Sequence, residues 1–170
     1  MDDAVLKLVL SVAAVAACAF AGRALARVDM RRSGILAETM DSLQLLRIHM
    51  LDGLMPLSAA LKRSEGYILR GTGEMMTDIS AAEAWHEFSC RQTARGGKLD
   101  SLAPADCDTL DRFFFSLGRS SREEQGRVFE TAIKELGELE HSARESGARK
   151  HRLYTSLGAL AGTALVIMLV

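Results

Sequence analysis

The chain has 170 residues, with 21 Lys or Arg against 22 Asp or Glu, so its net charge is close to zero. This length allows one domain, and the balanced charge argues against a nucleic-acid-binding protein, which normally has a basic excess. Aromatic residues make up only 5% of the chain, whereas Ala, Leu, Arg, Glu and Met are plentiful. Because these residues lose little side-chain freedom in a helix, the composition predicts an all-α fold.

The N-terminal segment, residues 4–22, is apolar and contains one charged residue, Lys7. Its 19 residues suffice to cross a bilayer core of about 30 Å. Signal peptides usually open with positive charge, whereas this chain opens with two aspartates. We therefore expect an uncleaved transmembrane helix over residues 1–23. The alternative is a processed N-terminus, either a signal peptide or a lipoprotein cleaved before Cys18.

A second uncharged segment, residues 153–170, closes the chain and predicts a C-terminal transmembrane helix. Basic residues follow the first segment and precede the second, and such residues tend to stay on the cytoplasmic side of a membrane. We therefore expect residues 24–152 to form a cytoplasmic domain with both termini outside. The residues expected to flank the membrane and orient the chain are Arg23, Arg27, Arg31, Arg32, Arg149, Lys150 and Arg152. They could contact anionic headgroups, only set the orientation, or meet a partner; we favour lipid contact and orientation.

The first amphipathic helix of the central region is predicted from apolar residues at three- and four-residue steps. These residues are Leu36, Met40, Leu43, Leu46, Met50 and Leu54. Gly53 and Pro56 interrupt the pattern, and a shorter helix is expected to start at Leu57, with the proline tolerated in its first turn.

Two further helices are predicted from their terminal residues. Ser80 and Glu83 have the spacing of a capping box, in which the hydroxyl and the carboxylate bind each other's backbone N–H groups. This box opens a helix that contains Trp85 and ends near residue 93. Pro104 starts the next helix, whose apolar side is Cys107, Leu110 and Phe114. Gly118 closes that helix, and Ser120-Ser121 with Glu123-Glu124 offers a second capping box.

The last helix of the central region is long and has an apolar stripe of Val128, Ala132, Ile133, Leu136, Leu139 and Ala143. No proline separates this stripe from the C-terminal segment, so one continuous helix is expected to run into the membrane. Short loops between amphipathic helices place neighbours antiparallel, which predicts a helical bundle.

No pattern in the sequence indicates catalysis. The stretches Gly71–Gly73 and Gly96–Leu99 lack the residues of a nucleotide-binding loop. The four histidines are too far apart to place two on one metal ion, and three cysteines without a short paired spacing suggest free thiols. We therefore expect no enzyme, cofactor, metal or small-molecule substrate.

Gly158 and Gly162 are one helical turn apart in the C-terminal segment. Small residues at this spacing allow another helix to approach closely in lipid. Chance is an equally good explanation in a short segment rich in small residues. If the spacing is functional, the two transmembrane segments pack on each other or on a membrane partner.

Several short motifs occur in a specific order along the chain. They are Leu6-Lys-Leu8, Leu43-x-x-Leu46, Pro56-Leu57, Glu83-Ala-Trp85, Leu117-Gly118, Ser121-x-x-Glu124-Gln125 and Tyr154-x-Ser156-Leu157-Gly158. In this order the chain resembles the stage III sporulation protein AB family of endospore-forming bacteria. It departs from the family at Arg47-Ile48-His49 and Asp52-Gly53, and Ser121 stands where an aspartate is usual.

The resemblance implies a role in sporulation. The family is similar to the cytoplasmic helical domains of the type II secretion platform, and it belongs to a channel complex that links mother cell and forespore. By that analogy the chain lies in the mother-cell membrane around the forespore and contacts a secretion-type ATPase and other channel subunits. The family motif residues, with structural or partner roles, are Pro56, Trp85, Leu117, Gly118, Glu124 and Gln125. The alternative is a membrane-tethered helical sensor or lipoprotein with its domain outside the cytoplasm.

Overall fold

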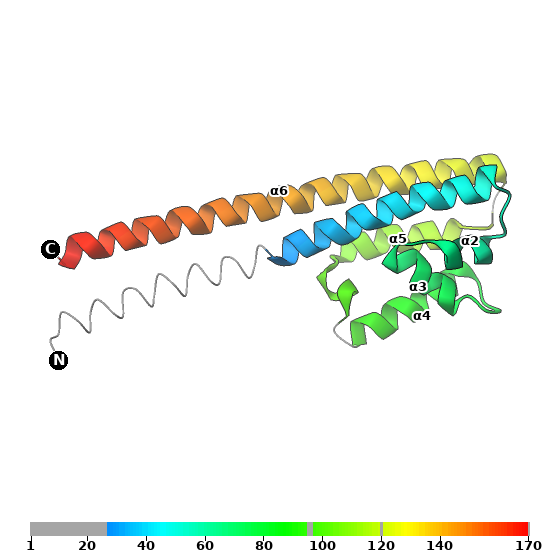
Figure 1. Ribbon diagram of the computed structural model, residues 1–170, viewed down its shortest axis with the longest axis horizontal. Helices are drawn as coiled ribbons and strands as arrows, with labels where there is room; N and C mark the ends of the chain where they lie inside the picture. The colour runs from blue at the N-terminus through cyan, green and yellow to red at the C-terminus, as the bar shows by residue number, and fades with distance from the viewer. Residues whose placement is uncertain (1–26, 95–96, 120, 170) are drawn as a thin grey trace. The chain divides into compact units, whose positions relative to one another are not determined.

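The computed structural model describes residues 27–94, 97–119 and 121–169, and every regular element in these ranges is a helix. The predicted all-α fold is therefore confirmed for this part of the chain (Figure 1). Two compact units are present. The first, Arg32–His141, lies inside the predicted domain of residues 24–152, and we call it the helical domain. The second combines Met1–Arg31 with Ser142–Val170, and we call it the terminal unit.

The elements follow one another with short connections. Helical residues 27–47 continue into a π-helix, η1 (Ile48–Asp52). The elements after it are α2 (Leu57–Arg63), α3 (Tyr67–Met75), α4 (Ala81–Ala94), the 3₁₀-helix η2 (Lys98–Ser101), α5 (Pro104–Ser116) and α6 (Arg122–Leu169). As the absence of proline predicted, α6 is one helix of 48 residues.

Helical residues 27–47 and α6 run antiparallel within the helical domain (Figure 1). At one end, the Arg47 guanidinium is 2.9 Å from Glu130. Further along, the Ser33 hydroxyl donates a 2.6 Å hydrogen bond to Glu140. Because early residues of one helix meet late residues of the other, the two helices are antiparallel.

The core of the helical domain lies between this helix pair and the shorter helices. Its largest fully buried side chains are Leu36, Leu43, Leu46, Leu61, Ile68, Leu69, Trp85, Leu110, Phe114, Phe129 and Leu136. Trp85 of α4 stacks on Phe114 of α5, with ring centroids 5.2 Å apart, and its indole N–H donates to Asp111. The core therefore draws on every α-helix of the domain, which ties short helices of little intrinsic stability to one another.

One predicted core residue, Leu54, is exposed. The α-helix gives way to η1 after Arg47, and the helical region ends at Gly53. Leu54 then has a φ of +48° and projects into solvent. The prediction was wrong because it extended one regular period through Met50, whereas the π-helix changes the residue spacing and Pro56 ends the helix early. The predicted stripe of the last helix also omitted Phe129, which is fully buried.

The first predicted capping box is confirmed at the start of α4. The Ser80 backbone N–H and hydroxyl donate to the Glu83 carboxylate at 2.9 and 2.8 Å, and the Glu83 N–H donates to the Ser80 hydroxyl oxygen at 3.3 Å. At the start of α6, the Glu124 N–H donates to the Ser121 hydroxyl at 3.4 Å, which is the hydroxyl half of the second box.

Within the described part of the chain, no helix combines the length and the hydropathy that crossing a membrane requires. The predicted N-terminal transmembrane helix, residues 1–23, lies outside the described residues. So do most side chains of the predicted C-terminal one. The two anchors remain predictions.

Acid should weaken the cap of α4. The backbone and hydroxyl hydrogen bonds from Ser80 lower the pKa of Glu83 below 4.5. A lowered carboxyl pKa stabilises the folded state above the ordinary value, and that stability is lost as the pH falls through the lowered pKa. We expect Glu83→Gln, which still accepts a hydrogen bond but does not titrate, to reduce the acid dependence of unfolding. Chemical unfolding followed by Trp85 fluorescence measures it. Identical pH profiles for both proteins would contradict the prediction.

Candidate interaction site

A bidentate ion pair joins helical residues 27–47 to the first turn of α5. The Arg32 guanidinium donates from Nε and Nη2 to the two carboxylate oxygens of Asp106, both at 2.7 Å. Asp106 is fully buried and also accepts a 2.8 Å hydrogen bond from the Ala103 backbone N–H. A buried carboxylate is costly unless it is paired and hydrogen-bonded. Asp106 therefore holds Arg32 inside the helical domain.

The structure thus gives Arg32 an intramolecular role that the sequence did not reveal. Arg32 was predicted to flank the membrane because it follows an apolar segment. Its partner is 74 positions away, and no local pattern links the two. The neighbouring Arg31 is exposed, as is Arg27, so these two remain available for the predicted contact with headgroups.

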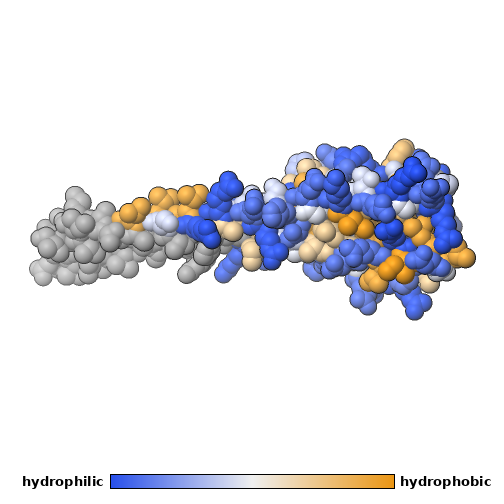
Figure 2. Space-filling model, turned by 90° about the horizontal axis from the view of Figure 1, so that it is seen from above, coloured by the Kyte–Doolittle hydropathy of each residue, from blue (hydrophilic) through white to orange (hydrophobic). Residues whose placement is uncertain are grey.

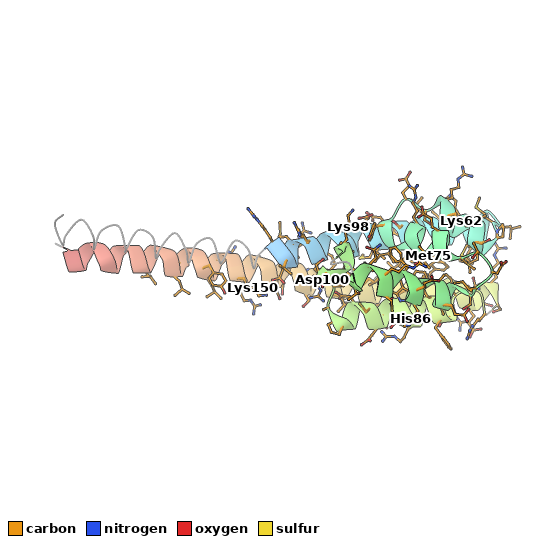
Figure 3. The ribbon with its side chains drawn as sticks, turned by 90° about the horizontal axis from the view of Figure 1, so that it is seen from below. Lys62, Met75, His86, Lys98, Asp100 and Lys150 are labelled. Carbon is orange, nitrogen blue, oxygen red and sulfur yellow. The ribbon has the colours of Figure 1, made fainter. Side chains whose placement is uncertain are left out.

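In the terminal unit, one basic residue of α6 forms an intramolecular ion pair and two others are exposed to solvent. Lys150, which is labelled in Figure 3, forms an ion pair with Asp29 at 2.8 Å. Arg149 and Arg152 are exposed and line a shallow groove together with Leu153. The structure therefore keeps two of the predicted flanking cations of α6, Arg149 and Arg152, in solvent on either side of one intramolecular ion pair.

An exposed apolar row follows these cations along α6. Leu153, Leu157 and Leu160 are spaced four and three residues apart, so they lie on one helix face, and all three are exposed. They contribute to the hydrophobic surface of this part of α6 in Figure 2. The order along the helix is thus a basic cluster first and an apolar row second.

The family motif residues take structural positions in the helical domain. Trp85 and Leu117 are buried in the core, and Gln125 is buried at the start of α6. Gly118 follows α5 with a φ of +80°, a conformation that favours glycine. A Cβ there would also lie 3.1 Å from the Leu57 side chain.

The remaining motif residues lie at helix ends. Pro56 immediately precedes α2 in an extended conformation, close to its predicted position in the first turn. Glu124 is exposed in the first turn of α6. Arg23 lies outside the described residues, and at Gly158 and Gly162 the structure describes the helical backbone but not its surroundings. Helix packing at those two glycines stays a prediction.

Polar clusters that could support chemistry are sparse. Among the described residues, no three His, Cys, Asp or Glu side chains could share a metal ion. The Cys90 sulfur lies 3.8 Å from Nε2 of His86, one turn earlier on α4, a contact that sequence spacing did not predict. Figure 3 labels His86. A shallow groove between α5 and α6 includes Arg112 and Glu135, which pair at 2.5 Å.

The family model for Stage III sporulation protein AB matches residues 7–170 of the sequence. The chain belongs to this family. A solved structure of Stage III sporulation protein AB is similar, with a TM-score of 0.57 and 19% sequence identity. The match covers 69% of this chain and 97% of the solved one, and at this identity it supports the fold. A comparison with curated proteins found no match. The resemblance seen in the ordered motifs is therefore confirmed, and the chain is a sporulation protein.

Removing one partner of the buried ion pair should destabilise this family member. Arg32→Ala leaves Asp106 buried without its cation, which should cost about 3 kcal/mol of unfolding free energy. Arg32→Lys retains the charge but not the two parallel hydrogen bonds, so it should recover only part of the loss. Chemical unfolding of the full chain in detergent, followed by Trp85 fluorescence, measures both.

The neighbouring Arg31→Ala is the matched control, since Arg31 is exposed. It should change the unfolding free energy by no more than about 0.5 kcal/mol. If Arg31→Ala and Arg32→Ala are equally destabilising, the ion pair is not a specific support of the fold.

Proposed function

We propose that this protein is a membrane platform subunit of the sporulation channel between mother cell and forespore, and that its helical domain docks a secretion-type ATPase. Family membership supplies the sporulation context. The observation that supports membrane attachment is the composition of α6, and ATPase docking rests on the similarity of the family to the type II secretion platform. This helix contributes Phe129 and Leu136 to the core of the domain, and its later residues form the basic cluster and then the apolar row.

Membrane attachment accounts for that order of residues. Exposed apolar surface costs about 25 cal/mol per Å² in water, and this cost disappears in hydrocarbon. The segment 153–170 has no charged residue. Its first three leucines, which form the apolar row, are exposed. Arg149 and Arg152 precede them and can reach anionic headgroups while the leucines enter the bilayer. We therefore place the membrane boundary near Leu153.

The same charges support a cytoplasmic domain in the mother-cell membrane around the forespore. Basic residues lie on the domain side of both apolar segments, as expected for loops retained in the cytoplasm. A domain in that position is accessible to a cytoplasmic ATPase. Docking rather than catalysis also fits this domain, because its family motif residues lie in the core and at helix ends.

Thiol labelling tests the topology. Cys90 is exposed and Cys107 is half-buried. Burial raises the pKa of the Cys107 thiol, and the neighbouring Asp106 adds to the shift, so a maleimide should label Cys90 first. In a Cys18→Ser chain made in vegetative cells, we expect a membrane-impermeant maleimide to label Cys90 only after lysis. Cys90→Ser should remove the fast phase. Equally fast labelling in intact cells would favour the alternative of an extracytoplasmic sensor or lipoprotein.

Direct binding tests ATPase docking. We expect the full chain in lipid nanodiscs to bind the purified ATPase saturably, with a Kd near or below about 1 μM. Empty nanodiscs of the same lipids control for adsorption to the bilayer. If the chain is helical by circular dichroism and shows no binding at micromolar concentration, direct docking is wrong.

A further inference from the structure

The backbone of the helical domain is irregular over one short segment, residues 48–54. The α-helix becomes the π-helix η1 at Ile48, and Leu54 follows with a φ of +48°. Among the described residues, Leu54 is the one non-glycine residue with a positive φ. Both features cost conformational energy, and both are frequent at binding and catalytic sites. The chain therefore holds this segment in a conformation that its own residues do not favour.

This segment and the helical turn before it expose large apolar side chains. Leu45 and Ile48 are one turn apart on one helix face, and they are 46% and 52% exposed. Leu54 is 73% exposed, more than any other large apolar side chain in the described part of the chain. In Figure 2, hydrophobic surface appears at several places on the helical domain, including the end to which η1 belongs. Strain and apolar exposure thus coincide in sequence.

Carboxylates flank the exposed apolar residues. Asp41 lies one turn before Leu45 and Asp52 one turn after Ile48, and both are exposed. Neither is in an ion pair with another described residue, and the guanidinium of the nearby Arg47 is engaged by Glu130. A partner that covers the apolar residues would therefore meet two free negative charges, which a basic rim complements.

Other exposed apolar residues have different surroundings. Val28 and Met30 are exposed in the terminal unit, between the exposed Arg27 and Arg31. The Phe115 ring is covered on one face by the Arg119 guanidinium, 4.4 Å from the ring centroid. The leucine row of α6 lies in the segment that we assign to the membrane. Leu45, Ile48 and Leu54 have no such cover. We call them, together with Asp41 and Asp52, the docking segment.

We propose that the docking segment is the surface on which the ATPase of the proposed function binds, and this inference rests on that function. The partner surface is an apolar groove bordered by Lys or Arg. It takes Leu45 and Ile48 as adjacent anchors on a helix, in the manner of a helix bound in a groove. Burial of Leu54 in the same contact removes its exposure to water. Asp41 and Asp52 steer the approach of the basic rim.

Leu54→Gly separates binding from folding. Glycine adopts a positive φ without steric cost, so the variant should unfold at the same or a higher temperature than the wild type. It also removes an exposed anchor, so its Kd for the purified ATPase should rise about tenfold or more. A residue with only a structural role would not lose binding while stability is maintained.

Two further variants locate the contact. Leu45→Ser with Ile48→Ser should weaken ATPase binding by about tenfold or more, whereas Phe115→Ser, a matched loss of an exposed apolar side chain, should leave the Kd unchanged. Asp41→Asn with Asp52→Asn should slow association at low salt and make the rate less sensitive to salt. All variants are measured as full chains in nanodiscs of one composition.

The outcomes distinguish this inference from the proposed function. If the wild type does not bind the ATPase, the proposed function fails and the docking segment fails with it. If the wild type binds and both apolar variants bind within twofold of it, the docking segment is wrong while ATPase docking stands. An unchanged salt dependence in the aspartate variant would overturn the basic rim of the partner.

Discussion

The helical domain depends on the burial of two apolar helix faces against each other, one from residues 27–47 and one from α6. Neither face is stable in water alone, and each helix supplies the cover that the other needs. This pairing also fixes where polar residues meet. It brings Ser33 to Glu140 and Arg47 to Glu130, and it holds residues 27–47 where Arg32 reaches the buried carboxylate of α5. The remaining helices pack onto the surface that this pair creates.

The basic residues near the apolar segments divide into two groups in the structure. Arg32 points into the helical domain and is engaged by Asp106, whereas Arg27, Arg31, Arg149 and Arg152 remain exposed. Only the exposed group can serve a membrane surface or a partner. A count of charges along the sequence treats all of them alike, because it contains no information on which cations find a carboxylate across the fold. The membrane proposal therefore rests on fewer residues than the charge pattern suggested.

Much of the local structure was predictable from the sequence, and the predictions that failed have a common cause. The capping box at Ser80 and Glu83, the helix after Pro104 and the burial of Trp85 follow from short-range preferences and appear as expected. The predicted burial of Leu54 does not occur, because the prediction assumed one unbroken helical period and the π-helix breaks it. The docking segment was missed for the same reason. Its backbone is irregular and exposes apolar residues. A regular spacing of apolar residues in the sequence does not reveal such an irregularity.

By itself, the sequence determined the all-α fold, the helix boundaries set by caps and prolines, and family membership through the order of its motifs. These depend on interactions within a few residues or on residue identity alone. Only the tertiary structure decided that Arg32 forms an ion pair with Asp106 and that a glycine is needed at position 118 beside Leu57. It also decided that Ile48 and Leu54 face solvent. Each of these depends on which distant segments pack together, and packing is set by the fit of whole helix faces rather than by any local pattern.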